Sequence, residues 1–493
     1  MTALRGGSPW LEIDNGVWSR DCIGEEQTAS YCQNIRDGHT ELTIEVPFSS
    51  NIDSRDELIQ RVQNAWIVCH SRLPECATEI STGTELPQTL KYATLKSDLD
   101  CADWIRETFR VVVGQSVEDV ARLTYSRRLP TKGKRSMLYL VIDPKAPTAR
   151  HHALIYNVSH VVSDAFSIPA FFNTMFRHMT QVPGDSQLPV SSIDYNGVVE
   201  RLPIHPSHLY DGKFTPTLRE KEQAISAVLS QEALYADHIS QSVVMYPRSN
   251  NNTSQHETHC LTLSYSESDS NAILSDLRSE TLSITFAAAA ATLLAVKNTY
   301  QKGHETGALL GMTRNARRWV KTDQSCPSAS SVVFLWIPFC EHWFRGSTRE
   351  AVMYLGRAIK EKLQPFLQSA HHLYMPSMAF ASRRAVNGMM AAAAREEGGG
   401  EPAAPCAPGF SAQGALSLER RFGDNGVVIE THDLRHTGRQ IGASPWVGMF
   451  SLWGRIVLSL GFDSFYHEPE KMKKLLADVH HNLASVRKLP SHL

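Results

Sequence analysis

Residues 151–168 (HHALIYNVSHVVSDAFSI) constrain the fold more than any other segment of the 493-residue chain. Apolar side chains alternate over residues 151–158, which predicts a buried β-strand. A short polar loop follows, and apolar residues then recur at helical spacing from Phe166 to Met179. The segment therefore predicts a strand, a loop and a helix in direct succession.

The loop carries His160 and Asp164, which form the only His-x-x-x-Asp spacing among 21 histidines. A histidine at the end of a buried strand is held in place and can still face a cavity, and its ordinary pKa is close to neutrality. Those are the properties of a general base. The alternative is that His160 is a hydrogen-bonded core histidine and that Ser163 or Asp164 only caps the next helix. The local pattern does not decide between the two, because about one such spacing is expected by chance.

Length and charge limit the class of protein. A chain of 493 residues is too long for one ordinary core, which predicts two lobes. The formal net charge is −2 and no long basic run occurs, so no nucleic-acid partner is expected. The longest apolar stretch, residues 284–296, is shorter than the roughly 20 residues of a membrane span, so no membrane partner is expected either.

Nine cysteines are scattered along the chain without a Cys-x-x-Cys pair, and the start of the chain has no apolar signal region. Both features favour a reducing compartment, and we expect a cytoplasmic protein. Neither a disulfide framework nor a metal site is predicted. No glycine-rich nucleotide loop and no nucleophile elbow occur, so no bound cofactor is expected. If His160 is catalytic, it should activate a hydroxyl or an amine of the substrate itself.

Composition along the chain predicts its organisation. We expect a first lobe over residues 1–190, with a helix that begins at a capping box of Ser54 and Glu57. A linker rich in Pro, Ser and Gly should cover residues 191–216. The second lobe should follow over residues 217–493, with a mobile low-complexity loop near 390–414.

The motif SHVVSDAFS resembles the active-site motif of the chloramphenicol-acetyltransferase-like superfamily. That superfamily includes the BAHD acyltransferases and the condensation domains of nonribosomal peptide synthetases. The chain is most similar to fungal O-acetyltransferases of the trichothecene type. Other parts of the resemblance follow in the same order, namely Trp18, Arg20, Gly24 and Glu25 near the start, GMTRNARRWV at residues 311–320, and the two segments GALSLERRFGDNGVVIE and FSLWGRIVLSLGFDSFYHEPEKM near the end.

The resemblance implies an α/β fold of two chloramphenicol-acetyltransferase-like lobes, with mixed sheets flanked by helices and a tunnel at the lobe interface. It implies an O-acyltransferase, monomeric, that uses acyl-CoA (acetyl-CoA) as co-substrate and a small secondary-metabolite alcohol as acceptor. His160 would be the general base. Asp164 would point away from substrate and pair with an arginine that fixes the loop, with Arg317 as the first candidate and Arg314 as the second.

The chain departs from the family pattern at several positions. Ser159 stands where many relatives have a first histidine, and Ala165 stands where many have glycine. The BAHD signature Asp-Phe-Gly-Trp-Gly is missing. We expect Ser159, Ala165 and Trp453 to line the tunnel. Two alternatives remain open: acyl transfer from a carrier-bound donor, as in condensation domains, and a cyclase or binding protein that reuses the fold.

Overall fold

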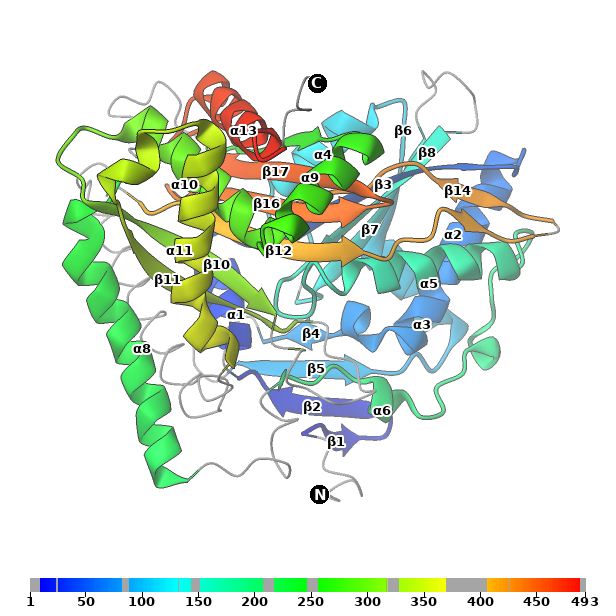
Figure 1. Cartoon of the computed structure of the whole chain (residues 1–493). Helices are drawn as coiled ribbons and strands as arrows, with labels where there is room; N and C mark the ends of the chain where they lie inside the picture. Colours follow the sequence, from blue (N-terminus) through cyan, green and yellow to red (C-terminus); the bar gives the residue numbers. More distant parts are fainter. Residues whose placement is uncertain are drawn as a thin grey trace.

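The computed structural model describes residues 9–23, 25–81, 88–131, 133–142, 151–206, 217–245, 256–315, 317, 328–368, 406–424 and 426–487. Three sheets flanked by helices form two lobes, which lie side by side in Figure 1. We call the sheets of four and seven strands, with their helices, the first lobe, and the six-stranded sheet with its helices the second lobe. The predicted class, mixed sheets flanked by helices, is confirmed.

The first lobe contains two sheets. The smaller has the order β1-β2-β5-β4, with β1 (Leu11–Asp14), β2 (Val17–Asp21), β5 (Thr89–Ala93) and β4 (Glu79–Ile80). The larger has the order β13-β14-β3-β8-β7-β6, with β13 (Arg421–Phe422), β14 (Ile429–Thr431), β3 (Leu42–Ser50), β8 (His151–Val158), β7 (Ser136–Ile142) and β6 (Phe109–Val113), and β15 (Arg435–Gly438) also pairs with β3. Only the β6–β7 pair of the larger sheet is parallel among the described residues.

The second lobe contains one six-stranded sheet. Its order is β11-β10-β12-β16-β17-β9, with β11 (Ser330–Pro338), β10 (Gly307–Asn315), β12 (Gly409–Leu416), β16 (Trp446–Leu452), β17 (Arg455–Asp463) and β9 (Thr258–Ser264). β12 pairs in parallel with both β10 and β16, and the other pairs are antiparallel.

The helices cover the faces of these sheets. Those of the first lobe are α1 (Glu25–Ile35), α2 (Arg55–Arg72), α3 (Asp98–Thr108), α4 (Val117–Tyr125), α5 (Ile168–Gln181) and α6 (Val198–Arg201). Those of the second are α8 (Leu218–His238), α9 (Glu267–Ser279), α10 (Ile284–Tyr300), α11 (Thr348–Gln368) and α13 (Pro469–Ala484). Short 3-10 turns are η1 (Pro74–Ala77), η2 (Val190–Ser192), η3 (Ile239–Gln241) and η5 (Glu341–Phe344).

Strand β8 is buried on both sides, because helices cover both faces of the larger sheet. Leu154 and Tyr156 belong to the core under α2 and α5, whereas Ala153 and Ile155 belong to a separate cluster under α4. A strand covered on both faces is apolar at nearly every position. In the second lobe, α10 is apolar all round and lies buried between α11, α13 and the sheet.

No single helix among the described residues has the length and apolar character of a membrane span. The bent pair α9 and α10, at 101° to each other, passes that test only when taken together.

Late strands of the chain complete the first lobe. Strands β13, β14 and β15, from residues 421–438, hydrogen bond in the larger sheet, and β14 and β15 pair directly with β3. The predicted second lobe of residues 217–493 therefore does not map onto one sheet. Residues 390–405 of the predicted mobile loop and residues 207–216 of the predicted linker lie outside the described residues. The end of that loop is an ordered strand, because residues 409–414 belong to β12.

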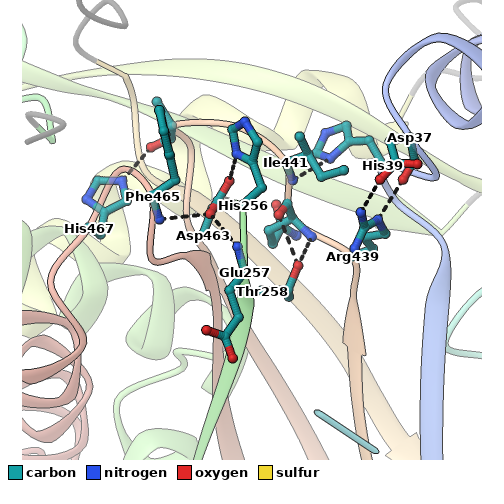
Figure 2. Close-up of polar contacts among 12 residues, drawn as sticks. Asp37, His39, His256, Glu257, Thr258, Arg439, Ile441, Asp463, Phe465 and His467 are labelled. Carbon is teal, nitrogen blue, oxygen red and sulfur yellow. Dashed lines mark hydrogen bonds and ion pairs between the residues drawn. The ribbon is translucent and has the colours of Figure 1, made fainter. Parts of the chain in front are cut away.

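The segment after β15 is bonded to both lobes (Figure 2). The Nε of Arg439 donates to the carbonyl oxygen of Asp37 over 2.6 Å, and Arg439 also forms an ion pair with the Asp37 carboxylate. The next residue, Gln440, donates its N–H to Thr258 Oγ1 over 2.9 Å and accepts from the same hydroxyl over 3.0 Å. Because Asp37 precedes β3 and Thr258 begins β9, this segment fixes the position of one sheet relative to the other.

Candidate active site

His160 lies in the turn directly after β8, and its side chain is half-buried. Strand β8 sits between β3 and β7, so the end of the strand cannot move without breaking two ladders. Among the described residues, no side chain or backbone group hydrogen bonds to the imidazole ring. A ring with a fixed backbone and two unengaged nitrogens is available to a substrate. This geometry disfavours the alternative of a hydrogen-bonded core histidine.

Hydrogen bonds from both lobes hold the backbone around His160. The neighbouring Ser159, which is fully buried, donates its hydroxyl to Gln33 Oε1 on α1 over 2.6 Å. The same Ser159 oxygen accepts from Val161 N–H over 3.2 Å. From the second lobe, the hydroxyl of Ser328 donates to the carbonyl oxygen of His160 over 2.9 Å. The histidine is thus anchored on each side by a different lobe.

The side chain of Asp164 binds Arg317. The two carboxylate oxygens accept from the two terminal guanidinium nitrogens, both over 2.9 Å. Asp164 also accepts from the backbone N–H of Ala329 over 2.9 Å and of Phe166 over 3.0 Å. The Asp164 side chain is 3% exposed and that of Arg317 is 25% exposed. A bidentate, mostly buried pair of this kind locks the loop to the end of β10.

The structure places the other candidates away from this pair. Arg314 donates to Ser331 and to a backbone carbonyl of α11, so it does not reach Asp164. Neither Ser163 nor Asp164 caps α5, whose N-cap is Ser167, so that alternative is wrong for Asp164. Ala165 is absent from the described residues with positive φ, so alanine fits its backbone without strain.

Trp453 lies in the turn between β16 and β17. Trp453 and Gly454 have φ values of 49° and 80° and form the two-residue connection between β16 and β17. The indole N–H donates to the carbonyl oxygen of Leu418 over 2.7 Å, and the guanidinium of Arg420 lies over the ring. These contacts assign Trp453 to packing at the end of the hairpin. Its role in lining a tunnel stays a prediction.

Buried charges lie near the base of the motif loop. Glu41, one residue before β3, is 1% exposed and accepts from Leu129 N–H over 2.6 Å. Burial raises the pKa of this carboxyl to about 7, and nearby arginines oppose part of the rise. Arg135, whose carbonyl oxygen accepts from Ser159 N–H over 2.7 Å, has a pKa that burial lowers to about 10. Among the described residues, no group of three or more metal-binding side chains could hold an ion.

A cavity of about 390 Å³ lies between the lobes, bounded by β3, β15, α4 and β9. Ser159, Ala165 and Trp453 do not line this cavity. Because Ser159 is fully buried and bonded to Gln33, it belongs to the packed interior and not to the wall of a tunnel, contrary to the prediction.

Gln33 and Ser328 were not among the predicted site residues. They lie more than 120 residues from the motif in sequence, and neither stands in a pattern that marks it.

Two lobes joined by crossing strands, with the His160 loop at their junction, make up the fold of the chain. The same fold occurs in solved acetyltransferase and condensation-domain structures. The structure is similar to that of TRI3 trichothecene 15-O-acetyltransferase from Fusarium sporotrichioides, with a TM-score of 0.76 and 15% identity over 99% of each chain. It is also similar to the epimerization domain of tyrocidine synthetase B, with a TM-score of 0.57 and 12% identity over 97% of this chain and 98% of that chain.

The sequence comparison specifies the family. The chain is 32% identical over 523 aligned positions to the acyl-CoA-dependent acyltransferase MAC1 of Pseudozyma antarctica (strain T-34), covering 96% of this chain and 94% of the relative. No family model matches the chain. The chain therefore belongs to the family of acyl-CoA-dependent acyltransferases, and acyl-CoA is its co-substrate.

Proposed function

We propose that this acyltransferase transfers an acyl group, most simply acetyl, from CoA to a hydroxyl group of a small secondary metabolite, with His160 as the general base. The observation that carries the proposal is the imidazole ring of His160, which has no hydrogen-bond partner among the described residues and sits on a backbone held by both lobes. The acyl-CoA-dependent relatives favour a CoA thioester over a carrier-bound donor.

The proposed reaction is a direct transfer. His160 accepts the proton of the acceptor hydroxyl while its oxygen attacks the thioester carbonyl, which forms the new C–O bond. The tetrahedral intermediate then collapses, the C–S bond breaks, and the imidazolium returns the proton to the CoA thiolate. General base catalysis of this kind contributes about 10²–10⁴-fold to the rate. Fixing both substrates beside one ring supplies a further part through proximity.

Asp164 and Arg317 take no part in the proton transfer in this proposal. Their pair keeps the His160 loop in one conformation, because it joins the loop to the residue that lies two positions after β10 through two hydrogen bonds. Asp164 is therefore a positioning residue. We further propose that the protein acts as a cytosolic monomer, which light scattering and fluorescence microscopy of a tagged protein would test.

The test begins with purified protein, acetyl-CoA, longer acyl-CoAs and a panel of hydroxylated metabolites. We expect release of free CoA thiol with at least one acceptor. The panel can be extended with metabolites that lack an acyl group in cells from which the gene has been deleted. His160→Ala should lower kcat by about 100-fold or more with an unchanged melting temperature. His432→Ala, an exposed histidine on the first lobe, is the control and should keep full activity. The proposal would be refuted if no acyl-CoA released free CoA thiol with any acceptor, or if His160→Ala kept near-normal turnover.

A further inference from the structure

The cavity between the lobes has walls from both of them. Strands β3 and β15 and helix α4 form one side, and β9 of the second lobe forms the other. The bonds of the segment after β15 to Asp37 and Thr258 hold these walls together (Figure 2). A volume of about 390 Å³ lies within the usual range for sites that bind small molecules.

Carboxylates dominate the charge of the cavity. Glu45, Glu118 and Asp433 line it, against a single guanidinium from Arg435. That guanidinium is shared, because it lies 3.7 Å from Glu45 and 3.4 Å from Asp433. The cavity is therefore negative at neutral pH. Coenzyme A carries a diphosphate and a 3′-phosphate, and like charges in a partly desolvated cleft repel each other.

Glu45 is the carboxylate best placed to bind a ligand. It is 7% exposed, lies on β3 and faces the cavity. Its contact with Arg435 is too long for a hydrogen bond, and no other described residue donates to its oxygens. A carboxylate this deeply buried without donors is costly unless a ligand supplies them.

The rest of the lining suits a hydroxylated ligand. Hydroxyl groups that can both donate and accept hydrogen bonds come from Thr43, Tyr125, Thr262, Ser264 and Thr437. The thiol of Cys260 and the ring of His436 also line the cavity.

The cavity lies close to the strand that carries His160. Thr43, on its wall, accepts a hydrogen bond from Asn157 Nδ2 over 2.9 Å. Asn157 precedes His160 by three residues, which is about 10 Å of extended chain. Glu45 itself pairs with Ile155, five residues before His160 and about 17 Å of extended chain from it, so an acceptor that contacts both Glu45 and the proposed base must extend along β3 past Thr43.

We propose that this cavity is the acceptor site, where Glu45 accepts a hydrogen bond from a hydroxyl of an uncharged acceptor, and that acyl-CoA approaches His160 from elsewhere. The inference rests on the proposed function and deepens it. It makes Glu45 a specificity-determining residue, distinct from the base.

The test measures two Michaelis constants with an acceptor that the panel identifies. Glu45→Gln should raise the KM for the acceptor about 10- to 100-fold, because a charge-assisted hydrogen bond is lost, and should leave the KM for acetyl-CoA within twofold. Gln is nearly isosteric with Glu, so the fold should persist. Thr262→Phe, which narrows the cavity from the opposite wall, should have the same selective effect. Glu430→Gln on β14, an exposed glutamate paired with Arg421, is the matched control and should change neither constant.

The outcomes separate the two proposals. An acceptor KM within twofold of wild type in both cavity variants would overturn the acceptor site while transfer itself persists. A parallel rise in the KM for acetyl-CoA would also overturn it, because CoA would then occupy the cavity. Absence of transfer by the wild-type protein with every acceptor would refute the proposed function, and the acceptor site with it.

Discussion

The pair of Asp164 and Arg317 makes a quantitative prediction. Removing one partner of a buried ion pair costs about 3–5 kcal/mol. Arg317 is 25% exposed, so water partly solvates it once it is released, and Asn at position 164 can still accept from the backbone. We therefore expect Asp164→Asn to lower the free energy of unfolding by about 2–3 kcal/mol. With an unfolding entropy of about 2.1 cal/mol/K per residue, the melting temperature should fall by about 2–3 °C.

A double-mutant cycle isolates the pair. Asp164→Asn, Arg317→Gln and the double variant should show a coupling of about 1.5–3 kcal/mol in denaturant unfolding. Each single variant should also lower kcat about 10- to 100-fold, because a misplaced His160 loop loses the reactive geometry. The exposed pair of Arg421 and Glu430 is the control, with an expected coupling of about 0–1 kcal/mol. Additive effects at 164 and 317, or normal turnover of Asp164→Asn, would show that the pair does not position the loop.

Three further perturbations test the surroundings of the site. Ser159→Ala leaves the buried Gln33 oxygen without its donor, so it should cost about 1–3 kcal/mol in denaturant unfolding and lower kcat more than KM; an unchanged kcat would contradict the positioning role. Burial raises the pKa of Glu41 from 4.5 to about 7, so between these pH values the folded protein keeps a proton that the unfolded chain has lost. The stability that Glu41 contributes while it is protonated is therefore lost as the pH rises through 7. The melting temperature of Glu41→Gln should therefore rise relative to that of the wild-type protein as the pH increases from 5 to 8. A difference in melting temperature that does not change with pH would count against the assignment. Arg439→Met removes the bonds to Asp37 and should make the segment after β15 sensitive to limited proteolysis, whereas wild-type resistance would show that the segment is held by other contacts.

Local pattern predicted the elements near the motif well. The strand at 151–158 and the cap at Ser54 are as expected, although the Glu57 side chain binds Arg61 and does not complete a capping box. The helix after the motif begins at Ile168 and not at Phe166, because the Ser167 hydroxyl accepts from the N–H of Asp164 and donates to its carbonyl oxygen, which closes a turn before the helix. Such turns depend on tertiary partners of the aspartate and leave no periodic signal.

Glycine-rich composition misled the prediction for residues 409–414. These glycines belong to the central strand β12, and packing explains them. A Cβ at Gly409 would collide with the ring of Trp446, and Gly414 has a φ of 69° beside a bulge. A glycine that makes room for a ring on the neighbouring strand cannot be distinguished by composition from a glycine in a loop.

Strands β14 and β15 complete the larger sheet of the first lobe, and this bears on how the protein is synthesised. Strand β3 leaves the ribosome about 380 residues before its two partners do, which at 5–20 residues per second is roughly 20–80 s. During that time one edge of the nascent sheet has no neighbour and can template association with other chains. Shortened or split genes that omit residues 429–438 should therefore yield insoluble product, and productive synthesis should depend on chaperones that shield this edge until translation ends.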